Sequence, residues 1–577
     1  MAQNEYEYVE MTLEASFVTD PKTCQLHEVS GLEAISKLFW FEIELVWLAE
    51  APLDPESVIG ERASLVVTRD NKEVRRINGV LSEIEHQLDT RTKFRTYKLR
   101  LVPTVHQLSL ASTYRVYLDT SPVKVIEKTL LRSEVPADQF QMQVSSPLAN
   151  APRDLIVQYG ETDLDFICRL AEHHGISFYF AHEGNKDIVV FTDLAANAGF
   201  HEVGNSFRLR RGGDRRDVYE FGKIVRRIPG SYEVNDYDHR KAQLVLHNKE
   251  KIAPKLLDTT WAKGRNYEYA PNYKIPAHGK ELAKIRSEEL QVPQITYRGA
   301  SDQPGFCAGH RIKVEEGLTS ATEQIAGQER VDDSFDTQLL LVEVEHHARF
   351  GVLTHGSAGA TVGKNPTGSN VSDFVTDGLP GMQPNSAAAS EALVQPGQVR
   401  GAKEKHYRNV FRGIPVQHTY RPARVTHKPR IDGLVTGMIV TPSQTIAVDL
   451  PHTPKPEAQI NEEGYYWVRF LFEDPIDEAA TQHQPCSLPV RMLQPHVGAD
   501  YGIHMPLRPG MEVLLGFLEG DPDRPFIVGG TYRTETPSPV VKKNATLNRI
   551  KTQSGVLIEM RDAQIAVPGR GSSSSGS

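Results

Sequence analysis

The stretch Gly502-Ile-His-Met-Pro-Leu-Arg-Pro-Gly-Met-Glu-Val-Leu-Leu-Gly-Phe-Leu-Glu-Gly-Asp-Pro-Asp-Arg-Pro525 carries the clearest fold signal in this chain. Residues 511–517 within it have the apolar pattern of a β-strand, and the run 520–525 that follows contains two prolines, which fix the backbone of a turn. This combination predicts antiparallel strands joined by a tight turn, as in a small β-barrel.

Similar strand patterns continue on both sides of this stretch. Alternating apolar residues recur at 415–440 and at 465–472, with Gly and Pro turns between them, so we assign residues 406–535 to one compact β domain. The preceding residues 351–405 are rich in Gly, Ala, Ser, Asn and Pro and poor in aromatic residues. Such a composition cannot bury enough apolar area to offset the entropy of ordering, so it predicts a linker or a long mobile loop.

The N-terminal residues 1–350 are also dominated by short alternating runs, such as 41–46 and 97–102, which predict half-buried antiparallel strands. Two helices interrupt them. The first is expected at about 162–174, because Thr162 and Asp165 resemble a capping box and Gly175 stands where a helix commonly ends. A hairpin over 176–191 should follow it, and a second helix is expected at about 279–291. The predicted class is therefore mainly β with a few helices.

The C-terminal part ends in an isolated strand pattern. Residues 546–562 alternate and then stop, and a short strand without a partner in its own chain would expose unpaired backbone amides. We therefore expect the strand within residues 546–562 to pair with another chain. The tail 569–577 is a Gly/Ser run of the kind found in linkers and cloning remnants.

The length, charge and cysteine content of the chain argue against several classes of function. The 577 residues suggest roughly three or four domains. The net charge of −9, without a separate Lys/Arg block, argues against binding of nucleic acid or anionic membranes. The acidic N-terminus does not resemble a signal peptide, and no apolar run predicts a membrane anchor. Four isolated cysteines indicate synthesis in a reducing cytoplasm; they are Cys24, Cys168, Cys307 and Cys486.

Several segments, in order along the chain, resemble the VgrG spike family of type VI secretion. The longest are Arg153-Asp-Leu-Ile-Val-Gln-Tyr-Gly-Glu-Thr-Asp-Leu-Asp-Phe-Ile-Cys-Arg-Leu170 and the stretch 502–525 quoted above. The others are 31–39, 235–241, 281–291 leading to 304–310, and 407–422. Six matches in the family's order are more specific than any single motif.

The resemblance implies a head over 1–350 related to the tail hub of contractile phages, with β-barrel-like subdomains. An OB-like barrel over 406–535 and the start of an intertwined triple-stranded β-helix needle over 536–568 would follow. It implies a homotrimeric spike, without enzymatic activity, that caps a tube of Hcp-type rings, pierces target envelopes and carries effectors. Expected partners are baseplate components, effector or adaptor proteins and a PAAR-type tip protein, although no residue present can be assigned to tip docking. The protein would be made in the cytoplasm and secreted by the type VI apparatus.

Two histidine pairs and one aspartate pair are the candidate metal ligands of this sequence, and each has a simpler structural interpretation. The pairs His173-His174 and His346-His347 are adjacent, so their side chains point in different directions, which suits a shared metal poorly. Asp521 and Asp523 lack the other oxygen ligands of a calcium loop, so a proline-fixed turn is favoured. We predict no metal site and no cofactor.

The sequence signals for a catalytic site or a nucleotide-binding site are equally weak. The run 359–365 departs from a phosphate-binding loop at both ends of its motif, so a flexible linker is favoured. The carboxylate pairs Glu42/Glu44 and Glu343/Glu345 have strand spacing, but no substrate pocket can be read beside them, so solvated strand faces are favoured. No catalytic, cofactor-binding or metal-binding residue is therefore assigned.

Three alternatives stay open at this point. One is the tail hub-spike of a contractile phage or phage-derived particle, and another is an evolved spike whose toxin domain lies beyond this chain. A monomeric carbohydrate-binding β protein is disfavoured because its tryptophans do not cluster; they are Trp40, Trp47, Trp261 and Trp467. The sequence does not indicate the effector cargo, the target cell or the natural C-terminus, nor whether the chain trimerises without its needle.

Overall fold

The computed structural model describes residues 9–87, 94–209, 217–252, 263–316, 337–350, 406–441, 457–474 and 488–562. The chain forms two compact units. Unit 1 contains residues 1–112, 121–152 and 162–428, and unit 2 contains residues 113–120, 153–161 and 429–577. The predicted linker 351–405 and the predicted tail 569–577 lie outside the described residues.

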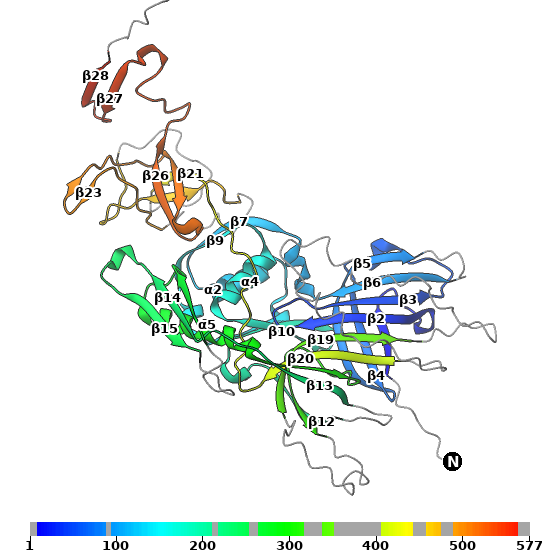
Figure 1. The fold of residues 1–577 in the computed structure, drawn as a ribbon. Coiled ribbons are helices and arrows are strands. Elements are labelled where there is room, and N and C mark those ends of the chain that lie inside the picture. The colour runs from blue at the N-terminus through cyan, green and yellow to red at the C-terminus, as the bar shows by residue number, and fades with distance from the viewer. Residues whose placement is uncertain are drawn as a thin grey trace, which may run out of the picture. The chain divides into compact units, whose positions relative to one another are not determined.

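Unit 1 is built around a twelve-stranded sheet of order β1-β4-β5-β6-β3-β2-β19-β18-β12-β13-β17-β20 (Figure 1). The alternating runs predicted at 41–46 and 97–102 are neighbours in this sheet, as β3 and β6. Its strands are β1 (Val9–Ala15), β2 (Cys24–Ala34), β3 (Trp40–Trp47), β4 (Arg62–Arg69), β5 (Lys72–Gln87), β6 (Arg95–Val102), β12 (His201–Leu209), β13 (Val218–Val225), β17 (Ile295–Ser301), β18 (His310–Glu316), β19 (Thr337–Arg349) and β20 (His406–Pro415).

Strand β19 joins parts of unit 1 that are distant in sequence. It pairs with β2 through Glu343–Arg349, with β18 through Thr337–Leu340 and with β20 over most of its length. Its residues Leu339, Leu340 and Leu341 are completely buried. The N-terminal strands and the strand that follows residue 405 are therefore held in one sheet.

The helix and hairpin predicted near residue 170 are confirmed. Helix α4 (Asp163–His174) begins after Thr162, whose Oγ1 accepts a hydrogen bond from the Asp165 amide, and ends at Gly175, which has a left-handed φ of 67°. Strands β10 (Ser177–Glu183) and β11 (Lys186–Thr192) form the hairpin, and β8 (Phe140–Gln143) pairs with β11 in parallel.

The second predicted helix also forms and begins three residues early. Helix α5 (Pro276–Gln291) has a proline in its first turn, where the missing amide proton costs nothing. It packs against a three-stranded sheet of order β15-β14-β16, made by β14 (Ser231–Asp236), β15 (Leu246–Lys251) and β16 (Arg265–Tyr269).

Other helical elements of unit 1 were not predicted. Helix α2 (Pro122–Arg132) starts at Ser121, whose side chain accepts from the Lys124 amide, and buries residues such as Val125 and Ile126. Short helices are α1 (Pro55–Val58) and α3 (Pro147–Asn150), with 3-10 turns at Pro21–Thr23, Thr104–Ser109, Ala137–Gln139, Ala195–Asn197, His239–Lys241 and Val292–Gln294. Among the described residues, no helix is long and apolar enough to cross a bilayer.

Unit 2 contains a small β-barrel-like domain with one apolar core. Its four-stranded sheet has the order β22-β21-β25-β26, and β25 occupies the run predicted at 511–517. Core residues include Ile439, Val468 and Leu515, together with Leu118 and Val157 from two earlier strands. The strands are β7 (Ser112–Thr120), β9 (Arg153–Thr162), β21 (Val435–Val440), β22 (Trp467–Phe470), β23 (Val497–Gly498), β24 (Tyr501–Gly502), β25 (Glu512–Phe517) and β26 (Pro525–Thr531), with 3-10 turns at Leu518–Gly520 and Lys542–Asn544.

The compact units differ from the predicted domain ranges in two respects. Strand β20 falls within the predicted barrel range 406–535, but it pairs with β17 and β19 in the head sheet. Strands β7 and β9 fall within the predicted head range 1–350, but they contribute to the core of unit 2. Both differences come from long-range strand pairing, which local alternation does not reveal.

The prediction that the last strand lacks a partner in its own chain is wrong. Strands β27 (Leu547–Lys551) and β28 (Leu557–Arg561) pair with each other as an antiparallel hairpin. The turn is possible because Gly555 adopts a φ of 96°, which a glycine tolerates. The two strands are therefore partners within one chain, and the start of an intertwined β-helix over 536–568 stays a prediction.

Glu473 in unit 2 gives a pH-dependent prediction. Burial raises the pKa of its carboxyl from the ordinary 4.5 to about 7, and Arg469 and Arg115 act in the opposite direction. The folded unit therefore holds the proton more tightly than the unfolded chain, and its stability should fall as the pH rises from about 4.5 to about 7. We expect Glu473→Gln to stabilise unit 2 by about 1–3 kcal/mol at pH 8, in denaturant unfolding curves.

The advantage of Glu473→Gln should disappear below pH 4.5, the ordinary pKa of the group. Glu519→Gln, on an exposed turn of the same unit, serves as the control and should shift stability little at either pH. A pH profile of Glu473→Gln parallel to that of the wild type would contradict the prediction.

Candidate functional site

Residues 416–428, the connecting segment, link β20 to the part of unit 2 that begins at Pro429. The segment has no regular secondary structure, so side chains must satisfy its backbone polar groups. Asn197 does so at its start. Its Nδ2 donates to the carbonyls of Val416 at 3.1 Å and His418 at 2.8 Å, and its Oδ1 accepts from the Tyr420 amide at 2.8 Å.

Arg421 fixes the middle of the connecting segment. Its Nη1 donates to the carbonyls of Gly175 and Asp193, both at 2.9 Å, and its Nε donates to Glu288 Oε2 on α5 at 2.8 Å. The arginine is buried. A buried guanidinium is stable only when its donors are used in this way, so Arg421 holds the segment against both the end of α4 and helix α5.

Glu172 of α4 fixes the end of the connecting segment. One carboxylate oxygen accepts from the amides of Val425 at 3.0 Å and Thr426 at 2.9 Å, and the other accepts from Thr426 Oγ1 at 2.7 Å. Burial raises the pKa of Glu172, although these hydrogen bonds act in the opposite direction. The carboxylate thus takes the place of a strand partner for this stretch.

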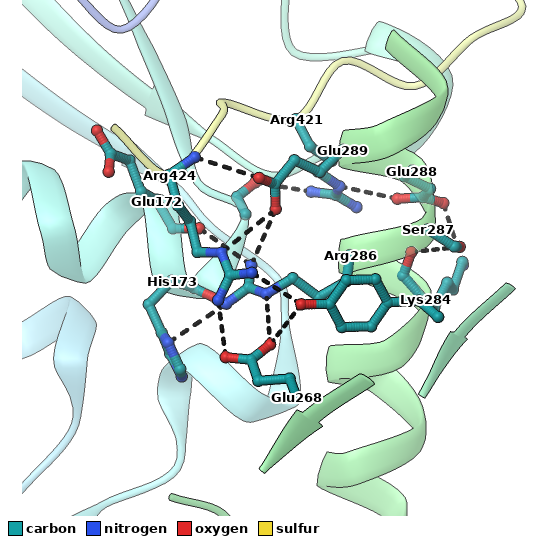
Figure 2. A network of polar contacts seen from close by, with 12 residues as sticks. Glu172, His173, Glu268, Lys284, Arg286, Ser287, Glu288, Glu289, Arg421 and Arg424 are labelled. Carbon is teal, nitrogen blue, oxygen red and sulfur yellow. Dashed lines mark hydrogen bonds and ion pairs between the residues drawn. The ribbon is translucent and has the colours of Figure 1, made fainter. Parts of the chain in front are cut away.

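Two arginines and two glutamates form the centre of the same network (Figure 2). Arg286, which is 0% exposed, lies 3.5 Å from Glu268 and 3.4 Å from Glu289. Arg424 donates to Glu268 at 2.7 Å and lies 3.7 Å from Glu289. Burial alone would raise the pKa of Glu268, but the two guanidinium groups hold it below its ordinary value.

We call this whole arrangement the polar clasp. It consists of Glu172, Asn197, Glu268, Arg286, Glu288, Glu289, Arg421 and Arg424. Figure 2 shows Arg286 and Arg424 pointing toward Glu268 and Glu289, which come from β16 and α5. These groups act on one another and on backbone atoms, so the geometry holds a chain segment in place.

A second buried network lies within the large sheet. Arg75 of β5 donates to Glu33 of β2 at 2.5 Å, and His346 of β19 lies 2.9 Å from the same carboxylate. The other ring nitrogen of His346 is 2.7 Å from the Tyr407 hydroxyl of β20. Burial favours the neutral acid, but Arg75 and His346 hold the pKa of Glu33 far below its ordinary value. The strands β2, β5, β19 and β20 are thereby joined through one buried network.

The predicted histidine pairs lie in different surroundings. His346 belongs to the buried network, whereas its neighbour His347 contacts Glu345 at the surface at 3.0 Å. His173 lies 3.3 Å from Arg286. Its ring packs edge-on against the ring of the buried His174, with 4.9 Å between the ring centroids. Among the described residues, no group of three or more His, Cys, Asp or Glu side chains is arranged to hold a metal.

The two aspartates of the 520–525 turn have a structural role within unit 2. Asp521 accepts from the Asp523 amide at 2.9 Å, as in a tight turn. Asp523 in turn accepts from the Val157 amide of β9 at 2.8 Å and lies 3.8 Å from Arg153. Its carboxylate connects this turn to β9 and contributes to the unit's fold.

The predicted carboxylate pairs lie on strand faces and contact basic groups. Glu42 lies 2.8 Å from Lys98, and Glu343 lies 3.5 Å from Arg412. The run 359–365 lies outside the described residues. A hollow of about 320 Å³ is lined by Glu73, Val74, Arg75, Arg76, His182 and Gly184, and both of its arginines are ion-paired.

Sequence reasoning missed both networks. Residues 281–291 and 407–422 belong to the family-like segments, but the sequence assigns no role to Glu288, Tyr407 or Arg421. The only local signal is an excess of charged residues on the helix of α5. Several partners lie far away in sequence, and Arg421 and Glu288 are 133 residues apart.

Two family models match this chain. The phage tail baseplate hub (GPD) model matches residues 32–351. The type VI secretion system/phage-baseplate injector OB domain model matches residues 478–532. The hub match covers most of unit 1, and the OB match covers the part of unit 2 that contains β23 to β26.

Similar curated proteins support the predicted resemblance to VgrG. The type VI secretion system spike protein VgrG3 of Vibrio cholerae is 26% identical over 543 residues, which cover 91% of this chain and 45% of that protein. VgrG5 of Pseudomonas aeruginosa is 26% identical, with 91% and 58% covered. The actin cross-linking toxin VgrG1 of Vibrio cholerae is 24% identical, with 89% and 40% covered. The chain spans about half the length of these relatives.

Solved structures show the same fold. The Escherichia coli c3393 protein, described as a component of the type VI secretion system, aligns with a TM-score of 0.55 at 18% identity, covering 90% of this chain and 99% of that chain. A VgrG-containing complex from Francisella, PdpA-VgrG in its lidded form, aligns with a TM-score of 0.57 at 10% identity, covering 97% and 76%. The expectation of a tail-hub-like fold with an OB domain is thereby confirmed.

The polar clasp predicts a local effect of Glu172→Ala. Removing the carboxylate leaves the Val425 and Thr426 amides without their acceptor, so their hydrogen exchange should become faster. The free energy of unfolding of the head should fall by about 1–3 kcal/mol. Glu50→Ala, at an exposed position, is the control, and unchanged exchange at residues 425 and 426 would refute the role of Glu172.

The Glu33 network predicts a larger and pH-dependent effect. Glu33→Gln leaves the Arg75 guanidinium buried without its anion, which should cost about 3–5 kcal/mol at neutral pH. Because the folded-state pKa of Glu33 is depressed, its contribution is present above the ordinary pKa and is lost as the pH falls. Wild type and variant should therefore converge in acid.

Thermal unfolding of the head at several pH values measures this difference. Glu14→Gln, which removes an exposed partner of Arg76, should cost less than about 1 kcal/mol. Equal losses for Glu33→Gln and Glu14→Gln would show that the buried network is not special.

Proposed function

We propose, from the premise that this chain belongs to the phage tail baseplate hub (GPD) family, that it is a structural spike protein of a type VI secretion apparatus. The observation that carries the proposal is the order of its two family matches, a hub followed by a type VI/phage-baseplate injector OB domain. Relatives named as type VI spike proteins match over about nine-tenths of this chain. In this role the protein caps the tube and delivers effectors into target cells.

The geometry of the polar clasp supports a mechanical role. Its charged groups bind backbone atoms and one another around the connecting segment, and a substrate would have to displace those contacts. We accordingly propose that residues 1–577 contribute no enzymatic step. A relative is named as an actin cross-linking toxin, and this chain covers 40% of it, so a longer natural protein with an added toxin domain stays an alternative.

Association into a trimer is part of the proposal. The hairpin β27–β28 buries little of its own apolar surface, and two-stranded hairpins are marginally stable alone. Its exposed apolar residues are Ile550, Val556, Leu557, Ile558 and Met560. Packing of three such hairpins around a common axis would remove this surface from water.

The remaining partners follow from the same role. An Hcp-type tube protein, baseplate components, a PAAR-type tip protein and effector or adaptor proteins would contact the spike. The protein would be made in the bacterial cytoplasm and leave the cell through the type VI apparatus. The tail hub-spike of a contractile phage is a second candidate, because the model that matches residues 32–351 is named for the phage baseplate hub.

The solution mass tests the trimer. We expect sedimentation to give a species of three times 64.4 kDa, the mass of one chain. Ile558→Asp combined with Met560→Asp should shift the population toward single chains, because charges would replace the apolar contacts. The matched control is Lys542→Asp with Lys543→Asp, on the exposed turn before the hairpin. A wild-type protein that stays monomeric at every concentration would contradict the proposal.

A further inference from the structure

The sheet β14–β16 of unit 1 has two different faces. One face packs against α5 and includes the buried Val234 and Leu246. The opposite face presents three rows of aligned residues, as strand pairing shows: Lys251, Ser231 and Arg265; then Lys249, Glu233 and Tyr267; then His247, Asn235 and Tyr269. We call this second face the basic tyrosine face. Figure 1 shows β14 and β15 beside α5.

The charge of this face is unlike that of the whole chain. Lys249, Lys251 and Arg265 are exposed, and the face has one carboxylate, Glu233. Lys249 lies 2.8 Å and Arg265 3.3 Å from that carboxylate, and His247 also lies 3.3 Å from it. Positive charge therefore exceeds negative charge here, in a chain whose net charge is −9.

The central carboxylate also orders the cations around it. Glu233 is almost fully covered, while the side chains of Lys249 and Arg265 are 50% and 59% exposed. One oxygen of Glu233 contacts Lys249 and the other contacts Arg265, so each cation keeps further donors that point to solvent. Because these cations are already held in place, less side-chain entropy is lost when a second anion binds them.

Two tyrosines give the face an apolar contact area. Tyr267 and Tyr269 stand two residues apart on β16, so they point to the same side of the sheet, and they are 48% and 54% exposed. Arg265 lies over the Tyr267 ring at 5.4 Å, and the Tyr267 hydroxyl accepts from Asn235 at 3.1 Å. Half-exposed tyrosines near arginine are typical of the centre of protein interfaces.

We propose that the basic tyrosine face is a docking surface for an acidic segment of a partner protein. The charge of the face sets the sign of the partner, because Lys249 and Arg265 are held in place by Glu233 and Lys251 adds a third exposed cation. Carboxylates of the partner bind Lys249, Lys251 and Arg265, and its apolar side chains cover Tyr267 and Tyr269. The proposal concerns this face alone and does not depend on the function proposed for the whole chain.

Binding of a defined peptide to the full chain tests the proposal. The probe is a fluorescent peptide of alternating Glu and Val, and its counterpart with Lys in place of Glu is measured beside it. Fluorescence anisotropy should detect the Glu peptide and should not detect the Lys peptide. Raising NaCl from about 0.05 M to about 0.5 M should weaken binding by about tenfold, because exposed charges are screened.

The variant Lys251→Glu with Tyr269→Ala removes one charge and one ring without touching Glu233 or the groups that contact it. It should bind the Glu peptide about tenfold more weakly, which corresponds to about 1.4 kcal/mol. Lys128→Glu with Tyr532→Ala makes the same chemical changes at exposed positions elsewhere and should bind as the wild type does. Circular dichroism verifies that both variants are folded.

Three results would overturn the proposal. One is the absence of any binding by the Glu peptide, and another is equal binding by both variants. The third is equal binding of single-stranded DNA or of phosphatidylserine vesicles that is lost in the same variant, since this would identify a general anion-binding surface.

Discussion

The backbone pairing of strand β19 is the constraint on which unit 1 depends. This one strand of Thr337–Arg349 bonds to β2, β18 and β20, which come from the beginning, the middle and the end of the head. Without it, the strands on its two sides would have no common ladder. The Glu33–Arg75–His346 network lies across the same strands, so the backbone and the buried charges reinforce one register.

The charged groups have different structural roles in the two buried networks of the head. In the large sheet, Glu33 and Arg75 specify which strands lie together. Buried ion pairs contribute more to such specificity than to the free energy of folding. In the polar clasp, Glu172 and Arg421 replace the hydrogen bonds that the irregular connecting segment cannot make with itself. In both places the charges are engaged in holding the chain, which agrees with a protein whose proposed role is mechanical.

Two exposed surfaces of the protein differ in chemical composition. The hairpin β27–β28 exposes apolar side chains, whereas the sheet β14–β16 exposes cations and tyrosines. The first composition favours association with identical copies, because apolar surface needs no complementary charge. The second favours a different partner, because a face with excess positive charge repels a copy of itself. A protein that assembles with itself and also carries other proteins, as proposed for this chain, needs both kinds of surface.

The sequence by itself determined the local elements and the family. Helix α4 could be placed from Thr162 and Gly175, and β25 from its apolar pattern, because caps, turns and alternation act within a few residues. The ordered motifs predicted a tail-hub-like head and an OB-like barrel, which the family matches confirm.

Only the tertiary structure decided which distant segments meet. The membership of β20 in the head sheet depends on pairing with strands that are distant in sequence, and that of β7 and β9 in unit 2 depends on long-range core packing. The hairpin at 547–561 depends on the φ of Gly555, and the partners of Arg286 and Glu33 come from separate strands and helices. A sequence window contains neither the long-range contacts nor the burial that gives an ion pair its role, since both arise only when the chain is folded.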